Sequence, residues 1–140
     1  MGPYLIEKLE LLTTLPGTEA VIPDSDVGFG VQCVGLVKRF SRAGATTGWK
    51  AGDSAMSLKS SGRLAKGTAI ATFGKSGRYE SFRHGNHACF FISFQSQGIL
   101  VLEQHVPPNF GTIQTRTIRC RGTDTKVSAS DNADAFSVIL

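Results

Sequence analysis

The chain has 140 residues, the usual size of one domain, and 41% of them are apolar. This composition is typical of a globular protein and excludes the intrinsically disordered class, which combines few apolar residues with high net charge. The formal charge of +4 includes no run of about five or more like charges. Charge alone therefore leaves open a solvated basic surface or affinity for an anionic polymer such as nucleic acid, a membrane surface or cell wall.

The N-terminal segment lacks the pattern of a secretory signal, because Glu7, Lys8 and Glu10 interrupt the stretch that would have to be apolar. Nowhere does an apolar run approach the roughly 18 residues of a transmembrane helix, so no membrane insertion is expected. We therefore expect a protein made in the cytoplasm without a signal peptide.

The first part of the chain is predicted to be helical. Leucines and an isoleucine recur at helical spacing over residues 5–15, and Pro16 and Gly17 end this pattern. Residues 16–30 are rich in glycine and proline and are predicted to form a loop. The strongest helical pattern covers residues 31–42, whose apolar side chains fall on one face: Cys33, Leu36, Val37 and Phe40.

The pattern changes to strands after Lys66. Residues 43–66 have no clear period, and their large apolar side chains are expected to anchor the core: Trp49, Leu58 and Leu64. Runs of β-branched and aromatic residues then predict strands over residues 68–73, 87–94, 99–103, 113–121 and 135–140. Helices followed by strands predict the α+β class, with a helix packed on an antiparallel sheet. We expect a single domain over residues 1–140, with residues 1–27 packed on it as an N-terminal extension.

Cys33 is the first candidate for chemistry. The three cysteines are odd in number and none has Cys-x-x-Cys spacing, which argues against a disulfide framework. Cys33 stands at the start of a predicted helix, where unpaired N–H groups and the helix dipole lower a thiol pKa and favour a nucleophilic thiolate. A lone cysteine on the inner face of a helix is otherwise a small buried apolar residue. Gln32, directly before it, is a candidate to bind a developing oxyanion together with the Cys33 backbone N–H.

His87 opens one of the predicted strands. Side chains alternate on a strand, so every second residue from His87 to Ser93 shares a face, and we expect that face to lie against the helix of Cys33. A cysteine at a helix start followed by a histidine on a later strand is the layout of papain-like hydrolases, in which the histidine takes the thiol proton and then protonates the leaving amine. A histidine that only bonds to backbone at a strand end is the simpler alternative.

Two neighbouring residues, Glu103 and Gln104, compete for the role of orienting His87. A turn at residues 96–98 makes the next strand antiparallel to that of His87 and brings Glu103 level with its start. Because side chains alternate, only one of the two competitors lies on the His87 face, and we favour Glu103. A one-residue bulge in either strand would exchange the two roles.

Several short segments together resemble the small amidase effectors of bacterial type VI secretion, and among these the third amidase-effector family. The segments are GVQCVGLVK (30–38), GTAIATF (67–73), GRYES (77–81), GNHACFF (85–91), GILVLEQ (98–104) and NADAF (132–136). The resemblance covers about residues 28–140. More distantly, a Gln-Cys pair at a helix start with a later histidine and glutamate is similar to the CHAP amidases and NlpC/P60 peptidases, which implies a papain-like fold of the NlpC/P60 type.

Carried over residue by residue, the resemblance implies that Cys33 is the nucleophile, His87 the base and Glu103 the third member of the site. Relatives often have aspartate in the third place, so Glu103 is a conservative departure, and Cys89 stands where a small residue such as alanine is expected. The implied reaction is hydrolysis of amide bonds in the peptide stems or cross-links of Gram-negative peptidoglycan, with the D-alanyl–diaminopimelate cross-link favoured. Neither a cofactor nor a metal is expected.

The resemblance also implies an antibacterial role. The type VI secretion machinery would deliver the protein to the periplasm of target bacteria, where its partners would be peptidoglycan and a cognate immunity protein that blocks the active site. The mild positive charge suits an anionic wall. Nucleic-acid binding is not expected.

Three alternatives remain open. A zinc site, although its spacing is not that of a familiar finger, would use the residues His84, His87, Cys89 and Cys120. A nucleic-acid module would combine the scattered arginines with a stacking surface of aromatic side chains: Phe73, Tyr79 and Phe82. A thiol-dependent transferase would use the same Cys33 and His87 with a different acceptor.

Overall fold

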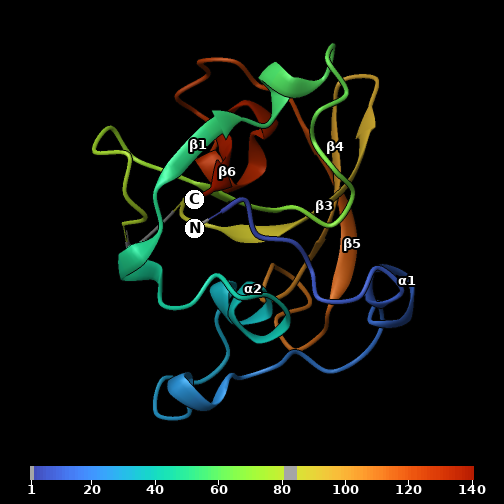
Figure 1. The fold of residues 1–140 in the computed structure, drawn as a ribbon, viewed down its shortest axis with the longest axis vertical. Helices are drawn as coiled ribbons and strands as arrows, with labels where there is room; N and C mark the ends of the chain where they lie inside the picture. Colours follow the sequence, from blue (N-terminus) through green and yellow to red (C-terminus); the bar gives the residue numbers. More distant parts are fainter. Residues whose placement is uncertain (1, 81–84) are drawn as a thin grey trace.

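The computed structural model describes residues 2–80 and 85–140, and within these ranges it forms one antiparallel sheet of six strands (Figure 1). The strands, in the order β1-β6-β2-β3-β4-β5 across the sheet, are β1 (Ala51–Ser54), β6 (Phe136–Ile139), β2 (Ala69–Thr72), β3 (Ala88–Gln95), β4 (Gly98–Glu103) and β5 (Gln114–Arg119). The α-helices are α1 (Leu11–Thr14) and α2 (Val34–Phe40), and short 3-10 turns connect the rest. The predicted combination of helix and antiparallel sheet is confirmed. In the described part of the chain, every helix is too short or too polar to cross a membrane.

Helix α2 is the element that the sequence pattern predicted best. Leu36 and Val37 are completely buried and Phe40 is 8% exposed, so the apolar stripe faces the core as expected. Burial of each such side chain contributes about 1.5–3 kcal/mol. The helix is shorter than the predicted 31–42, because Cys33 is its N-cap and the backbone turns to an extended conformation at Ser41.

The two faces of the sheet bury separate apolar clusters. Helix α2 lies against β3 (Figure 1). Ala88 and Phe90 of this strand belong to the same apolar cluster as the buried side chains of the helix. Cys89 and Phe91 belong to the cluster on the opposite face. The expectation that the alternating residues from His87 to Ser93 lie against the helix was therefore wrong. The helix packs on the intervening positions, Ala88 and Phe90.

The N-terminal segment and β1 also differ from the sequence prediction. Residues 5–15 form a helix only over α1, because Leu5 instead pairs with Thr68 in a β-bridge and the Ile6 N–H donates to the Gly67 carbonyl at 2.8 Å. β1 was not predicted, since its sequence Ala-Gly-Asp-Ser has no β-branched or aromatic residue. β1 is a strand nevertheless, because it pairs with β6. Trp49, just before β1, is completely buried, as expected of a core anchor.

Candidate active site

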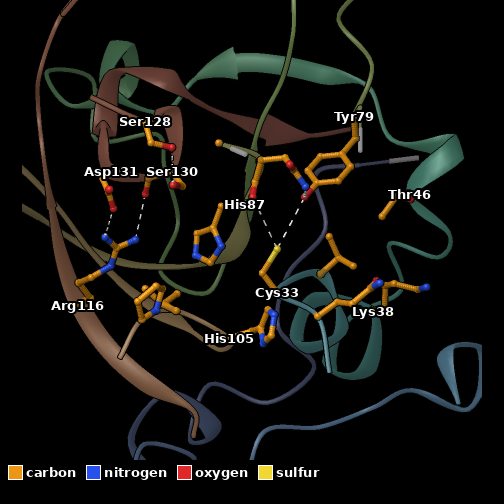
Figure 2. A pocket seen from close by; sticks show the side chains of 16 residues that line it. Cys33, Lys38, Thr46, Tyr79, His87, His105, Arg116, Ser128, Ser130 and Asp131 are labelled. Atoms are coloured by element: carbon orange, nitrogen blue, oxygen red, sulfur yellow. Dashed lines mark hydrogen bonds and ion pairs between the residues drawn. The ribbon is translucent and has the colours of Figure 1, made fainter. Parts of the chain in front are cut away.

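Cys33 lies in a cleft of about 890 Å³ whose lining comes from several separate elements (Figure 2). Gly30, with a φ of +76°, turns the chain just before the helix, and Cys33 follows at the N-cap of α2. This position leaves the thiol half-buried, with one side open to the cleft. Gln32 also lines the cleft, and its side chain is exposed.

His87 lies directly before β3, and its backbone is tied to β2. The Thr72 hydroxyl accepts from the His87 N–H at 2.9 Å, and the Thr72 N–H donates to the His87 carbonyl at 3.0 Å. The ring of Phe136 meets the imidazole edge-on at 6.2 Å. Backbone and ring contacts together hold the imidazole where Figure 2 shows it, between Cys33 and Arg116.

Glu103, rather than Gln104, contacts His87. The Nε2 atom of His87 donates to Oε1 of Glu103 at 2.8 Å. A bulge in β3 between Phe91 and Ser93 is the reason, because it shifts the β3–β4 register by one residue. Beyond the bulge the register places Glu103 opposite Cys89, on the side of the sheet that His87 also faces.

Gln104 points to the opposite side of the sheet and holds the chain around Cys33 in place. Its Oε1 accepts from the Val21 N–H at 2.9 Å, and its Nε2 donates to the Val21 carbonyl at 2.9 Å and to the Gln32 carbonyl at 2.8 Å. All three of these hydrogen bonds are made to backbone groups of the protein. Gln104 is therefore a structural link between β4 and the segment that precedes α2.

Arg116 completes the surroundings of Glu103, and the sequence analysis did not identify it. Its Nε donates to Oε2 of Glu103 at 2.7 Å and its Nη2 to Oε1 at 3.0 Å, and Gln114 adds a donor at 2.9 Å. Its Nη1 in turn donates to Asp131 at 2.7 Å. The pairing of β5 with β4 positions Arg116, but this pairing could not be assigned from the sequence with the correct register.

The electrostatic surroundings favour a charged Cys33–His87 pair. Burial raises the pKa of the Cys33 thiol, but the hydrogen bond and charge of His87, together with the Tyr79 hydroxyl, outweigh burial and bring the pKa below its ordinary value. Burial lowers the pKa of His87, but its bonds to Cys33 and Glu103 prevail and raise it to about 9. These directions describe a thiolate beside an imidazolium.

The other cysteines have surroundings of a different kind. Burial raises the pKa of the Cys89 thiol well above its ordinary value. Burial also raises the pKa of the Cys120 thiol, to a smaller degree. Within residues 2–80 and 85–140, no group of three or more histidine, cysteine or acidic side chains is arranged to hold a metal ion. His84, a member of the zinc alternative, and Phe82, a member of the nucleic-acid alternative, lie outside the described residues.

Comparison with known proteins identifies the class. A curated type VI secretion amidase effector 2 protein from Salmonella typhi is 32% identical over 120 residues, which are 81% of this chain and 87% of the relative. A solved structure titled type 6 secretion amidase effector 2 superposes with a TM-score of 0.74 at 28% identity, covering 99% of this chain and 94% of that one. Fold and sequence together define an amidase effector of type VI secretion.

The family within this class follows from a sequence model described as domesticated amidase effector 2, which matches residues 18–139. The chain belongs to this family. The resemblance seen in the sequence thus found the correct class, although it favoured the third amidase-effector family rather than the second. The match also begins at residue 18, about ten residues before the resemblance, and so includes Val21.

Proposed function

We propose that this chain is a cysteine-dependent peptidoglycan amidase with a papain-like site of the NlpC/P60 type. The observation that carries the proposal is the position of His87, which bonds through Nε2 to the buried Glu103 and has Cys33 as its other partner. Nδ1 is then the ring nitrogen available to the thiol. The amidase effectors to which the chain is similar support hydrolysis of an amide.

In the proposed mechanism, Cys33 is the nucleophile and His87 the general base. His87 takes the thiol proton, the thiolate attacks the amide carbonyl, and the imidazolium protonates the leaving amine. Glu103 holds the imidazole in one tautomer and stabilises its positive charge. We assign Gln32 and the Cys33 backbone N–H to the oxyanion, since Gln32 lines the cleft beside the thiol.

The proposed substrate is the peptide part of Gram-negative peptidoglycan, either its stems or its cross-links, with the D-alanyl–diaminopimelate cross-link favoured. An antibacterial effector with this substrate acts in the periplasm of the target cell, reached through the type VI secretion machinery. A cognate immunity protein that covers the cleft would protect the producing cell. We treat residues 1–140 as one domain, with residues 1–27 packed on it through contacts such as that of Val21 with Gln104.

Digestion of purified sacculi tests this proposal. We expect Cys33→Ala to lose hydrolysis by a factor on the order of 10⁴ or more, as when a member of a catalytic triad is removed, while its melting temperature stays near that of the wild type. Cys120→Ala is the matched control, because Cys120 carries a thiol outside the cleft, and Cys89→Ala should also remain active. Mass analysis of the released fragments identifies the bond that is cut. Hydrolysis at the wild-type rate by clean Cys33→Ala protein would refute the proposal.

A further inference from the structure

Tyr79 is a polar side chain of the cleft that the proposed mechanism does not use. Its hydroxyl oxygen lies 3.9 Å from Cys33 Sγ, and the residue is only 9% exposed (Figure 2). Trp49 meets its ring edge-on at 5.2 Å and Phe73 does so at 6.3 Å. A ring packed on two sides by other aromatic rings cannot swing away, so the hydroxyl has a fixed place beside the thiol.

The hydrogen bonds around Tyr79 determine which way its hydroxyl points. Asn86 donates through Nδ2 to the Tyr79 oxygen at 3.3 Å, so the oxygen already acts as an acceptor there. Among the described residues, the remaining partner of the hydroxyl is Cys33 Sγ, toward which its own hydrogen is free to point. Burial, followed by the charge of Cys33, raises the pKa of Tyr79 far above its ordinary value, so the group stays a donor throughout the working pH range.

The distance favours an oxygen over the sulfur as the real target of this donor. At 3.9 Å the contact with Sγ is long even for a sulfur acceptor. The carbonyl carbon under attack bonds to Sγ, so an oxyanion on that carbon lies only two bonds from a sulfur that is 3.9 Å from the hydroxyl. This geometry lets the oxyanion come within about 3 Å of the hydroxyl, the distance at which oxyanion donors act. The hydroxyl therefore gains its short hydrogen bond only as the tetrahedral state forms.

We propose that Tyr79 is a catalytic residue whose hydroxyl donates to the oxyanion formed when Cys33 attacks an amide carbonyl. This inference rests on the proposed function and adds a side-chain donor to the one assigned to Gln32. The acceptor is the carbonyl oxygen of the scissile amide, so any amide that reaches Cys33 would be activated in this way.

The step balances without a co-reactant other than water. The Cys33 sulfur forms a bond to the carbonyl carbon, and the carbonyl electron pair moves to the oxygen that Tyr79 binds. When this pair returns, the C–N bond breaks and the nitrogen takes the proton that His87 received from the thiol. Water then attacks the thioester with His87 as base, Tyr79 binds the second oxyanion, and release of the carboxylic acid restores the thiol.

The test is Tyr79→Phe, which keeps the ring packed against Trp49 and Phe73 and removes only the hydroxyl. Hydrolysis of a purified cross-linked muropeptide should fall in kcat by a factor on the order of 10², with little change in KM, as for loss of one oxyanion donor. Alkylation of Cys33 by iodoacetamide displaces iodide from a saturated carbon and forms no oxyanion. Its plateau rate at full thiol ionisation should therefore change by less than about twofold.

Tyr4→Phe is the matched control, because it makes the same change at the chain's other tyrosine, which is not among the residues that line the cleft. An unchanged kcat in Tyr79→Phe would overturn the inference. So would an equal fall in kcat and in the alkylation plateau, since the hydroxyl would then act on the nucleophile itself. Cys33→Ala, assayed in parallel, separates the two proposals: if that variant is inactive and Tyr79→Phe is normal, only the role of Tyr79 is lost.

Discussion

At the scale of single residues, the site is a chain of contacts between groups of alternating charge, which begins in the cleft, passes through the buried Glu103 and ends at the surface. Cys33 and His87 form its first pair, Glu103 and Arg116 the second, and Asp131 ends it at the surface with 56% of its side chain exposed. A carboxylate as buried as Glu103 costs several kcal/mol unless it is paired. Two cationic neighbours provide that compensation, so burial fails to raise the pKa of Glu103 and the pKa lies below its ordinary value.

Glu103→Gln is therefore expected to slow hydrolysis by a factor on the order of 10² to 10⁴ and to narrow its pH range. In the wild type, His87 keeps its proton up to a pH of about 9, so activity should fall above that pH. The carboxylate raises the pKa of His87, and a neutral amide would not. The alkaline limb of kcat/KM should move to lower pH in the variant, which a pH series on a soluble muropeptide measures.

Glu10→Gln, the same change at an exposed position beside α1, serves as the control and should leave both rate and pH profile unaltered. A Glu103→Gln enzyme with the wild-type rate and alkaline limb would exclude Glu103 from the proposed mechanism. Because Arg116 loses one of its two carboxylate partners in this variant and keeps only Asp131, we also expect lower stability, by about 1–3 kcal/mol.

The sequence predicted that Cys33, His87 and Glu103 lie together, and the structure places them so; their roles remain the proposal. Residue types and the order of elements were enough for this, because a cysteine at a helix start and a histidine at a strand start are local patterns. Arg116 was not predicted as part of this site, and Tyr79 was named only for the stacking surface of the nucleic-acid alternative. Each approaches the site through pairing or packing between distant segments, which leaves no local pattern in the sequence.

At the scale of elements, the bulge in β3 decides which of two adjacent residues reaches His87. The two-residue hairpin pairs Gln95 with Gly98, and with this register alone Gln104 would face the histidine. The extra residue between Phe91 and Ser93 shifts the register by one, so that Glu103 instead of Gln104 lies on the face of His87. The sequence-based choice of Glu103 was thus correct as geometry, although neither the exact hairpin pairing nor the compensating bulge was predicted.

Gln104→Ala should act on stability rather than on chemistry. It removes the hydrogen-bond partner of three part-buried backbone groups, the N–H and carbonyl of Val21 and the carbonyl of Gln32, which costs about 1–3 kcal/mol in the free energy of unfolding. Urea denaturation measures this loss. Gln97→Ala, an exposed position in the hairpin turn, should change stability by less than about 0.5 kcal/mol. Unchanged stability combined with a large loss of kcat would transfer the orienting role from Glu103 to Gln104.

Some helices and strands were not predicted correctly from local sequence patterns. Residues 31–42 were predicted as a helix because their apolar stripe is periodic, and that stripe is buried in α2. The helical spacing of residues 5–15 did not produce a helix of that length, because the β-bridge of Leu5 to Thr68 takes its first part. β1 has no strand-forming residues of its own and exists through its partner β6. Tertiary pairing overrides weak local preference in both cases.

At the scale of the whole molecule, the proposed function depends on the compartment. We expect the protein to be harmless in the cytosol of a Gram-negative host and lytic when an added export signal directs it to the periplasm, because its proposed substrate lies outside the inner membrane. Growth and lysis of cells that express the protein with and without the export signal measure this difference. Exported Cys33→Ala protein is the control for the burden of export alone. Equal toxicity from the cytosolic and the exported protein, or toxicity from neither, would contradict the effector role.

The place of β6 in the sheet affects when the chain can fold during its synthesis. β6 lies between β1 and β2, and it comes from the last part of the sequence. On the ribosome, β1 lacks its partner strand in the sheet until residue 139 has emerged. Phe136 and Ile139 leave both apolar clusters incomplete until then. Pairings so distant in sequence form slowly. We therefore expect the complete cleft, and with it catalytic activity, to form only after β6 has been synthesised.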